Sequence, residues 1–364
     1  MRVTFPHMGN LWISLKAMLT YLGVQVIVPP PCNKQALQAG AKWAPEFACL
    51  PLKLNLGNFI QAREMGADTI VMAGGCGPCR FGYYAQVEHV ILHDLGYNYQ
   101  LVVMEPPEKH IGELLQRIKY ITGQNSWWQV MQGIRFGFRK ACLVDQLEKR
   151  AFYLRPREKR SGSTDKALQE ALATVDAASN WRELEQAKHQ AMQRLDEVKT
   201  VQRPVLRVAL IGEIYTLLEP FANLELEKRL GEMGVEVDRS IYLSEWINDH
   251  LFLGLVRGMR SSKAFSQAAA PYLAHFVGGH GQESVGSAVY YARQGYDGAI
   301  HVLPFTCMPE IVAMGILPRV SQGTGLPVMS LIVDEHSGAA GVQTRLEAFV
   351  DLLARQKRHK GAFA

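Results

Sequence analysis

Cysteine is the residue type whose spacing in this sequence points most directly to chemistry. The chain has six cysteines, and five of them fall at expected strand ends or in loops: Cys32, Cys49, Cys76, Cys79 and Cys307. Cys76 and Cys79 are three residues apart, a spacing at which both thiolates can reach one metal site. Because cysteines in a reducing compartment seldom form structural disulfides, we interpret these five as metal ligands or redox groups.

Three of these cysteines are followed two positions later by proline, in Cys49-Leu-Pro51, Cys76-Gly-Pro78 and Cys307-Met-Pro309. With six Cys and 17 Pro in 364 residues, chance would give about 0.3 such triplets. Proline and glycine shape a rigid loop without flexible bulk, and a cluster sulfur needs backbone N–H donors around it. The repeated triplet therefore indicates that these cysteines share one function.

Other kinds of cysteine site remain open at this point. A structural zinc site with four cysteine ligands would use the same thiolates. An isolated Cys-x-x-Cys would also suit a thioredoxin-like redox pair, but that interpretation leaves the other loop cysteines unexplained. Cys142 falls in a helical segment, and we interpret it as a small buried apolar residue.

Several polar residues lie close to these segments. Arg80 directly follows the Cys-x-x-Cys pair and could put a cation beside an anionic cluster or a substrate carboxylate, and Lys53 lies similarly close to Cys49. Glu335 and His336 follow an expected strand, the position where acid–base groups occur in α/β proteins. We therefore take Arg80, Glu335 and His336 as candidate catalytic residues, with capping, solvation or loop hydrogen bonds as the structural alternative.

The elements that must position these residues alternate between strands and helices. The chain opens with strand, helix and strand and continues with helix and strand, at residues 2–5, 11–22, 24–28, 56–65 and 69–72. The same order returns after residue 204, with strands at 206–211, 234–237, 299–303 and 328–333 and helices at 224–233, 289–294 and 342–353. In each half, one strand runs directly into a cysteine loop.

This repetition predicts two related domains, and Gly23-Val-Gln-Val26 matches Gly234-Val-Glu-Val237. Alternating strands and helices favour parallel sheets, with ligands at the carboxyl ends of the strands. We predict an α/β fold with two Rossmann-like or flavodoxin-like parallel-sheet domains and a helical middle region. The expected boundaries are 1–107 for the N-terminal domain with the cysteine loops, 108–202 for the middle region, and 203–364 for the C-terminal domain, with a helical insertion at about 244–285.

Composition excludes several classes of partner. The chain is 48% hydrophobic and 20% charged, with a net charge of +5 that is spread widely, so no basic footprint for nucleic acid is visible. No apolar run reaches the ~18 residues that span a bilayer, and the N-terminus lacks the features of a signal peptide. We therefore expect a cytoplasmic protein with neither a nucleic-acid nor a membrane partner.

Four segments together resemble the 2-hydroxyacyl-CoA dehydratase superfamily. They are Phe47-Ala-Cys-Leu-Pro-Leu-Lys53, Gly74-Gly-Cys-Gly-Pro-Cys-Arg-Phe-Gly82, Pro304-Phe-Thr-Cys-Met-Pro-Glu310, and Asp334-Glu-His-Ser-Gly338 continuing to Thr344-Arg-Leu-Glu-Ala-Phe349. The nearest branch resembles the stand-alone proteins called activase-related, which are akin to double-cubane cluster proteins. The resemblance covers both α/β halves and little of the middle region.

The resemblance implies a cysteine-ligated iron–sulfur cluster, either 4Fe–4S or a double-cubane 8Fe–9S cluster. It implies ligand positions at Cys49, Cys76 and Cys307, with Cys79 and Cys32 as further ligands. A separate ATP-hydrolysing iron–sulfur activator would supply a low-potential electron. The expected activity is that of a dehydratase, which forms a ketyl radical on an acyl-CoA, or of a double-cubane reductase acting on a small molecule, in a homodimer or heterodimer.

The sequence departs from the dehydratase pattern in its number of cysteines. In that family each of two subunits supplies three cysteines to its own cubane, whereas this single chain offers five in loops. A closed cluster used only for electron transfer fits equally well, so a non-catalytic electron-transfer or activator-associated protein remains the alternative. The chain has no full Walker or Gly-x-Gly-x-x-Gly pattern, which agrees with a partner that handles the ATP.

Overall fold

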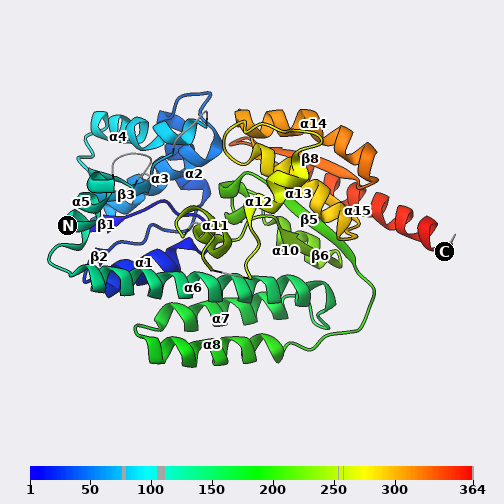
Figure 1. Ribbon diagram of the computed structural model, residues 1–364, viewed down its shortest axis with the longest axis horizontal. Coiled ribbons are helices and arrows are strands. Elements are labelled where there is room, and N and C mark those ends of the chain that lie inside the picture. The colour runs from blue at the N-terminus through cyan, green and yellow to red at the C-terminus, as the bar shows by residue number, and fades with distance from the viewer. Residues whose placement is uncertain (76–78, 105–110, 253, 257, 363–364) are drawn as a thin grey trace.

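The fold has two parallel β-sheets that lie side by side, with long helices running below them (Figure 1). The computed structural model describes residues 1–75, 79–104, 111–252, 254–256 and 258–362, and all statements below concern these residues. We call residues 1–104 the first half and residues 206–362 the second half. Within the described chain, none of the helices combines the length and the apolar composition that crossing a membrane requires.

Each half contains a four-stranded parallel sheet, and the strand order is the same in both. The first sheet has the order β2-β1-β3-β4, formed by β1 (Arg2–Thr4), β2 (Gln25–Val26), β3 (Thr69–Ala73) and β4 (Gln100–Met104). The second has the order β6-β5-β7-β8, formed by β5 (Leu206–Gly212), β6 (Val235–Arg239), β7 (Gly298–Pro304) and β8 (Val328–Val333). The predicted α/β class with two parallel-sheet domains is confirmed.

Helices connect the strands and cover the sheets, which is how parallel sheets become buried on both faces. In the first half these are α1 (Leu11–Tyr21), α2 (Lys34–Trp43), α3 (Leu50–Glu64), the short 3₁₀ helix η1 (Arg80–Tyr83) and α4 (Tyr84–Asp94). In the second half they are α9 (Ile214–Leu218), α10 (Leu226–Glu232), α11 (Leu243–His250), α12 (Ser262–Ala269), α13 (Gly281–Arg293), α14 (Met308–Thr324) and α15 (Ala339–Ala362). Every residue of β7 is buried, as expected for a central strand.

The two halves share part of their hydrophobic core. Leu50 and Leu54 of α3 pack in one cluster with Val208 of β5, Leu217 of α9 and Val302 of β7. Because this cluster draws apolar side chains from both halves, separating the halves would expose them to water. The halves therefore form one packed unit rather than two independently mobile domains.

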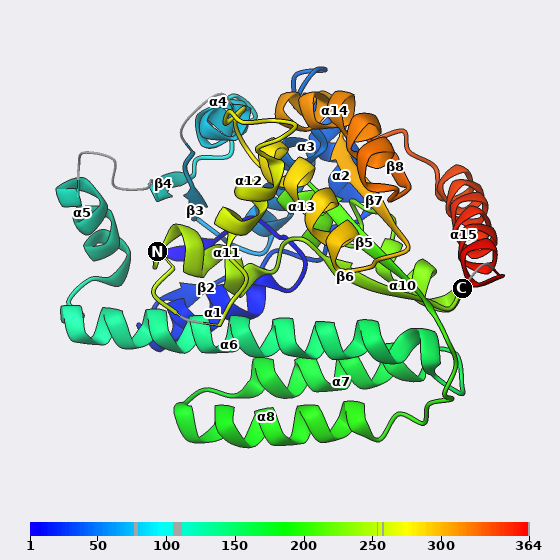
Figure 2. The ribbon, with the colours of Figure 1, turned by 45° about the vertical axis from the view of Figure 1, so that its right-hand side comes forward.

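The middle of the chain is helical and consists of α5 (Ile111–Thr122), α6 (Trp127–Leu154), the 3₁₀ helix η2 (Arg155–Arg157), α7 (Ser163–Ala177) and α8 (Trp181–Asp196). A capping box formed by Ser126 and Gln129 starts α6. In both views α6 runs below the two halves, with α7 and α8 on its far side (Figures 1 and 2). Ile13 of α1 and Phe136 of α6 belong to the core that these helices share.

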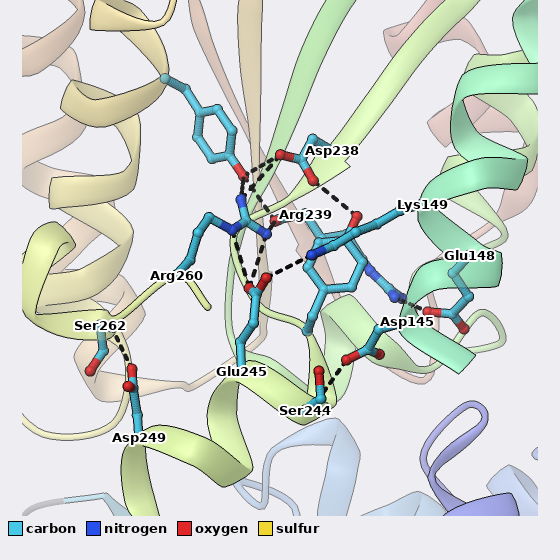
Figure 3. Close-up of polar contacts among 12 residues, drawn as sticks. Asp145, Glu148, Lys149, Asp238, Arg239, Ser244, Glu245, Asp249, Arg260 and Ser262 are labelled. Atoms are coloured by element: carbon cyan, nitrogen blue, oxygen red, sulfur yellow. Dashed lines mark hydrogen bonds and ion pairs between the residues drawn. The ribbon is translucent and has the colours of Figure 1, made fainter. Parts of the chain in front are cut away.

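Polar contacts fix α6 to the second half (Figure 3). Asp145 accepts a hydrogen bond of 2.7 Å from the backbone N–H of Ser244, and Glu148 pairs with the guanidinium of Arg239. Lys149 forms an ion pair of 2.6 Å with Glu245. Burial, followed by the charge of Glu148, raises the pKa of Asp145 to about 7. These contacts hold α6 against β6 and α11, so one helix is anchored to both halves.

Candidate metal centre between the two halves

The carboxyl ends of strands from the two sheets face each other, and a short hydrogen-bond network joins their loops. Arg80, after β3, donates from Nη1 to the carbonyl oxygen of Phe47 over 2.8 Å and from Nη2 to the carbonyl oxygen of Thr306. Thr306 also donates from Oγ1 to Phe47 over 3.0 Å. Thr306 has φ +68°, a left-handed conformation that strains a β-branched residue. This strained residue directly precedes Cys307.

Three of the predicted ligand cysteines stand at helix starts. Cys49 is the N-cap of α3, Cys79 the N-cap of η1, and Cys307 the N-cap of α14. Pro51 and Pro309 lie in the first turns of α3 and α14, where proline fits because those backbone N–H groups have no helical partner. This explains two of the Cys-x-Pro triplets. The sequence predicted α3 to begin near residue 56, whereas Pro51 allows it to begin at Leu50.

The structure brings Cys49, Cys79 and Cys307 together from three loops of the two halves. A Cβ atom added to Gly279 would lie 3.8 Å from Cys79 Sγ and 3.2 Å from Pro309 Cγ, so Cys79 borders the start of α14. The charge of Cys79 contributes to the raised pKa of Cys49, and that of Cys49 contributes to the raised pKa of Cys307. Cys76 lies outside the described residues.

Burial dominates the acidity of these thiols. It raises the pKa of Cys49 to about 12, raises that of Cys79, and raises that of Cys307 most of all. The charge of Glu213 acts in the same direction at all three, whereas Arg80 lowers the pKa of Cys49 and Cys79. Cys49 also shares a short hydrogen bond with the Tyr84 hydroxyl. Without a cation these sulfurs are neutral thiols, and a metal ion would supply the positive charge that favours their ionisation.

Carboxylates of the second half surround the sulfurs. Glu213 follows β5 and accepts hydrogen bonds of 2.9 Å from the backbone N–H groups of Tyr215 and Thr216. Burial is the main cause that raises its pKa to about 7. Glu310 is fully buried in the first turn of α14; its Oε2 lies 2.7 Å from His301 Nε2, while its Oε1 has no hydrogen-bond partner among the described residues. The site thus combines thiols with acidic groups.

The remaining candidate catalytic residues have different surroundings. Glu335 forms a buried ion pair with Lys53 of α3, and Lys53 also donates to the carbonyl oxygen of Glu46 over 3.1 Å. The side chain of His336 is 86% exposed and lies 4.0 Å from Glu335 Oε1. Glu335 therefore joins the two halves through Lys53, whereas His336 faces solvent.

Cys32 lies in a separate cluster. Its sulfur is 4.0 Å from His7 Nδ1, 3.2 Å from Asn58 Oδ1 and 3.5 Å from the Tyr215 hydroxyl, and its raised pKa reflects burial followed by the charge of Glu219. Asn58 lies more than two helical turns along α3 from its N-cap, Cys49. The structure thus separates Cys32 from the three sulfurs that it brings together.

The spacing of the three sulfurs bears on which metal they suit. Among the described residues, His7, Cys32 and Glu219 are the group of potential ligands whose donor atoms all lie within 4.8 Å of one another. Cys49, Cys79 and Cys307 do not meet this criterion, so at least two of their sulfurs are more than 4.8 Å apart. Tetrahedral zinc would need sulfur–sulfur separations of about 3.8 Å. Ligands on one cubane are separated by about 6–7 Å. At least one pair of these three sulfurs is therefore farther apart than tetrahedral zinc requires.

Cys142 lies on α6, where it is buried, and burial raises its pKa to about 11. Its electrostatic neighbours are Asp145, Ser244 and Arg139, which lie away from the other cysteines. All the described cysteines are free of disulfides.

Sequence reasoning missed Glu213, Glu310 and His301. Glu213 follows the predicted strand 206–211, so the strand-end rule that selected Glu335 could have found it. Glu310 closes the Pro304–Glu310 segment but received no role. No feature of the sequence singled out His301 as a functional residue, because a histidine within an apolar strand is expected to belong to the core. No protein-family model matches the chain, and a comparison with curated proteins found no match.

Proposed function

We propose that this chain is an iron–sulfur protein that holds its cluster between the two halves through Cys49, Cys76, Cys79 and Cys307. We propose further that it acts with a separate ATP-hydrolysing activator in low-potential electron transfer, as a dehydratase-like or reductase-like enzyme. The observation that carries the proposal is the convergence of Cys49, Cys79 and Cys307 at helix starts of both halves.

The local chemistry supports a cluster at these residues. Helix N-termini offer unpaired backbone N–H groups and a partial positive charge, both of which stabilise thiolate sulfur. Cys49 and Cys307 are 9% and 8% exposed, so bulk water is largely kept from their sulfurs. At least one pair of these sulfurs is farther apart than a tetrahedral zinc ion requires, which agrees with a larger metal centre.

The acidic surroundings support a low reduction potential. Glu213 and Glu310 place carboxyl groups beside Cys307. Negative charge on such groups disfavours the addition of an electron to a nearby cluster. Arg80 is the described cation that opposes this effect at Cys49 and Cys79. A cluster in such surroundings would require a strong electron donor, which agrees with an ATP-driven activator.

Exposed apolar side chains next to the cysteines support a docking partner. Phe47, Phe305 and Met308 are 69%, 53% and 45% exposed, and each lies within two residues of Cys49 or Cys307. Large apolar side chains that gather around one functional site are typical of protein interfaces. We assign this surface to the activator, because an electron donor must approach the cluster closely.

In the catalytic form of the proposal, a proton must move at the substrate. Glu310 Oε1 is a fully buried oxygen without a hydrogen-bond partner among the described residues, and His301 holds the other oxygen of that carboxyl. We assign proton exchange to this oxygen, with His301 as its positioning residue. Lys53 and Glu335 are assigned to joining the halves rather than to chemistry.

The test is to isolate the chain anaerobically and to measure iron, acid-labile sulfide, zinc and the electronic spectrum. We expect a brown protein with about four iron and four sulfide per chain for one cubane, or about eight iron for a double cubane. Stoichiometric zinc without iron or sulfide would refute the proposal. A cluster that the activator reduces but that turns over no acyl-CoA or small molecule would favour the electron-transfer alternative.

A further inference from the structure

We propose that His7, Cys32 and Glu219 form a second metal site, which binds a single divalent cation of the Zn²⁺ type and joins the two halves. His7 follows β1 and Cys32 follows β2 of the first half, whereas Glu219 follows α9 of the second half. This site uses none of the four cysteines assigned to the cluster. It therefore goes beyond the proposed function and does not depend on it.

The three ligand atoms lie close to one another. His7 Nδ1 is 3.1 Å from Glu219 Oε2 and 4.0 Å from Cys32 Sγ, and all three ligand atoms lie within 4.8 Å of one another. Tetrahedral Zn²⁺ would need about 3.3 Å between nitrogen and oxygen and about 3.6 Å between nitrogen and sulfur. Shifts of a few tenths of an ångström would bring the nitrogen contacts to those separations.

The direction of the contacts favours a metal over a catalytic triad. In a nucleophile–histidine–carboxylate triad, the nucleophile and the carboxylate contact opposite ring nitrogens. Here Cys32 and Glu219 both contact the same nitrogen, His7 Nδ1. A proton relay from Cys32 through the imidazole ring to Glu219 would need contacts at both ring nitrogens. The three donor atoms instead face one another, as ligands of a single cation do.

The next layer of residues fixes these ligands. Glu219 Oε2 accepts a hydrogen bond of 2.7 Å from the backbone N–H of Gly9, and Glu219 Oε1 accepts one of 3.0 Å from Phe221. Gly9 has φ +50°, and a Cβ atom there would lie 2.0 Å from the carbonyl oxygen of Leu218. Only glycine lets the two halves approach so closely at this point.

Asn58 places a further oxygen donor beside Cys32. It is fully buried, and its amide nitrogen donates to the carbonyl oxygen of Pro30 over 2.9 Å, which aims Oδ1 at Cys32 Sγ. Oδ1 lies 3.2 Å from Cys32 Sγ, close enough for a cation held by the sulfur to contact the amide oxygen as well. A cation satisfies both atoms, so we assign Asn58 Oδ1 as the fourth ligand, while the Tyr215 hydroxyl donates to the sulfur.

The donor set and the burial identify the class of metal. One imidazole, one thiolate and two oxygens suit a borderline-soft cation such as Zn²⁺ rather than Ca²⁺ or Mg²⁺. His7, Cys32 and Glu219 are 5%, 8% and 3% exposed, so the cation would be shielded from water. A closed four-ligand site of this kind is structural, and it would hold the first half to the second.

The test is to titrate Co²⁺ into the full-length chain carrying Cys49→Ser and Cys307→Ser, prepared anaerobically without iron, and then to compete it with Zn²⁺. The two substitutions remove Cys49 and Cys307 from the cluster site, whose thiols could give a similar band. Because Co²⁺ bound to a thiolate absorbs through sulfur-to-metal charge transfer, we expect this band at about one Co²⁺ per chain. In this background Cys32→Ser should abolish the band, whereas the control variant Cys142→Ser should retain it. Glu219→Gln keeps the thiol and should weaken Co²⁺ binding by at least ~100-fold, since it removes a direct ligand.

Circular dichroism without metal checks that each variant is folded. A band that survives when Cys32→Ser is added to this background would overturn the proposal. If Cys32→Ser does not fold, Glu219→Gln decides: unchanged Co²⁺ affinity would overturn the site. Absence of an iron–sulfur cluster would leave all these outcomes unchanged, so the two proposals can fail separately.

Discussion

The two halves have the same strand order but bring different chemistry to their shared interface. The first half contributes soft ligands and cations, namely Cys32, Cys49, Cys79, Lys53 and Arg80. The second half contributes mainly carboxyl groups, with a single thiol among them: Glu213, Glu219, Glu310, Glu335 and Cys307. Equivalent strand ends have thus acquired complementary rather than identical side chains.

This difference in side-chain charge between the halves explains how their interface is held together. A buried cation or carboxyl group alone is costly, but pairing across the interface offsets much of that cost. Lys53 meets Glu335, and His7 meets Glu219, so each half supplies the partner that the other requires. Neither half has a complete set of the proposed ligands by itself, and the two pairs named above each draw one partner from each half.

The largest expected effect comes from removing the thiol of the second half. Cys307→Ala should abolish retention of iron and sulfide, because the sulfurs of the first half would then lack a ligand from across the interface. Cys142→Ala, which removes a buried thiol on α6, should leave the iron content unchanged. Iron and sulfide analysis after anaerobic isolation measures both. Full iron retention in Cys307→Ala would mean that the first half holds the metal alone.

The second prediction concerns the ion pair between Lys53 and Glu335. Lys53→Met should lower the free energy of unfolding by about 2–4 kcal/mol, because it leaves the largely buried Glu335 without its cation. Denaturant unfolding measures the change. In a double-mutant cycle, adding Glu335→Gln should recover part of the loss.

A matched control for this pair lies on the surface of α8. Lys188→Met removes one partner of the exposed Lys188–Glu185 pair, whose atoms are 3.3 Å apart, and should cost less than about 0.5 kcal/mol. If Lys53→Met and Lys188→Met lower the free energy of unfolding equally, the ion pair between the halves contributes no more to stability than an exposed pair does.

The smallest effect concerns pH and Glu213, whose surroundings include Glu310 and the three sulfurs. Its folded pKa of about 7 lies above the ordinary value of 4.5 for a glutamate side chain, so the folded state keeps a proton that the unfolded state loses. Stability should therefore fall as pH rises through this window. Because the half-buried Glu213 is partly screened, Glu213→Gln should gain about 1–2 kcal/mol relative to wild type between pH 5 and 8.

Unfolding of the metal-free chain at several pH values measures this difference. Glutamine accepts the two N–H bonds of α9 less well than glutamate, which shifts the free energy of unfolding of the variant by the same amount at every pH. The prediction therefore concerns how the difference between wild type and variant changes with pH. A wild-type-to-variant difference that does not change with pH would contradict a raised pKa at Glu213.

Much of the fold followed from local sequence patterns. The strands before Cys76 and Cys307 are short apolar runs bounded by glycine or proline, and the structure has them at Thr69–Ala73 and Gly298–Pro304. The strand β4 was not predicted, although Gln100–Met104 has the same apolar character. The repeated order of elements gave the two parallel sheets, because alternation of strands and helices leaves few other topologies.

The composition of the site was harder to predict, because it depends on contacts between residues far apart in the sequence. Nothing near Cys32 indicated that its neighbours would be His7 and Glu219, which are 25 and 187 residues away. The Cys-x-Pro triplets were read as rigid loops, and the structure has two of them as helix starts. Local sequence thus identified reactive positions but not which of them meet.

The division of the site between the halves also sets an order of events during synthesis. Cys79 and Cys307 are separated by 228 residues. At ~5–20 residues per second, Cys79 is made ~11–46 s before Cys307. During that interval the thiols of the first half lack this partner from the second half. A complete set of the proposed ligands exists only after Cys307 has been made, so the proposed cluster could bind between the halves only once the second half has been synthesised that far.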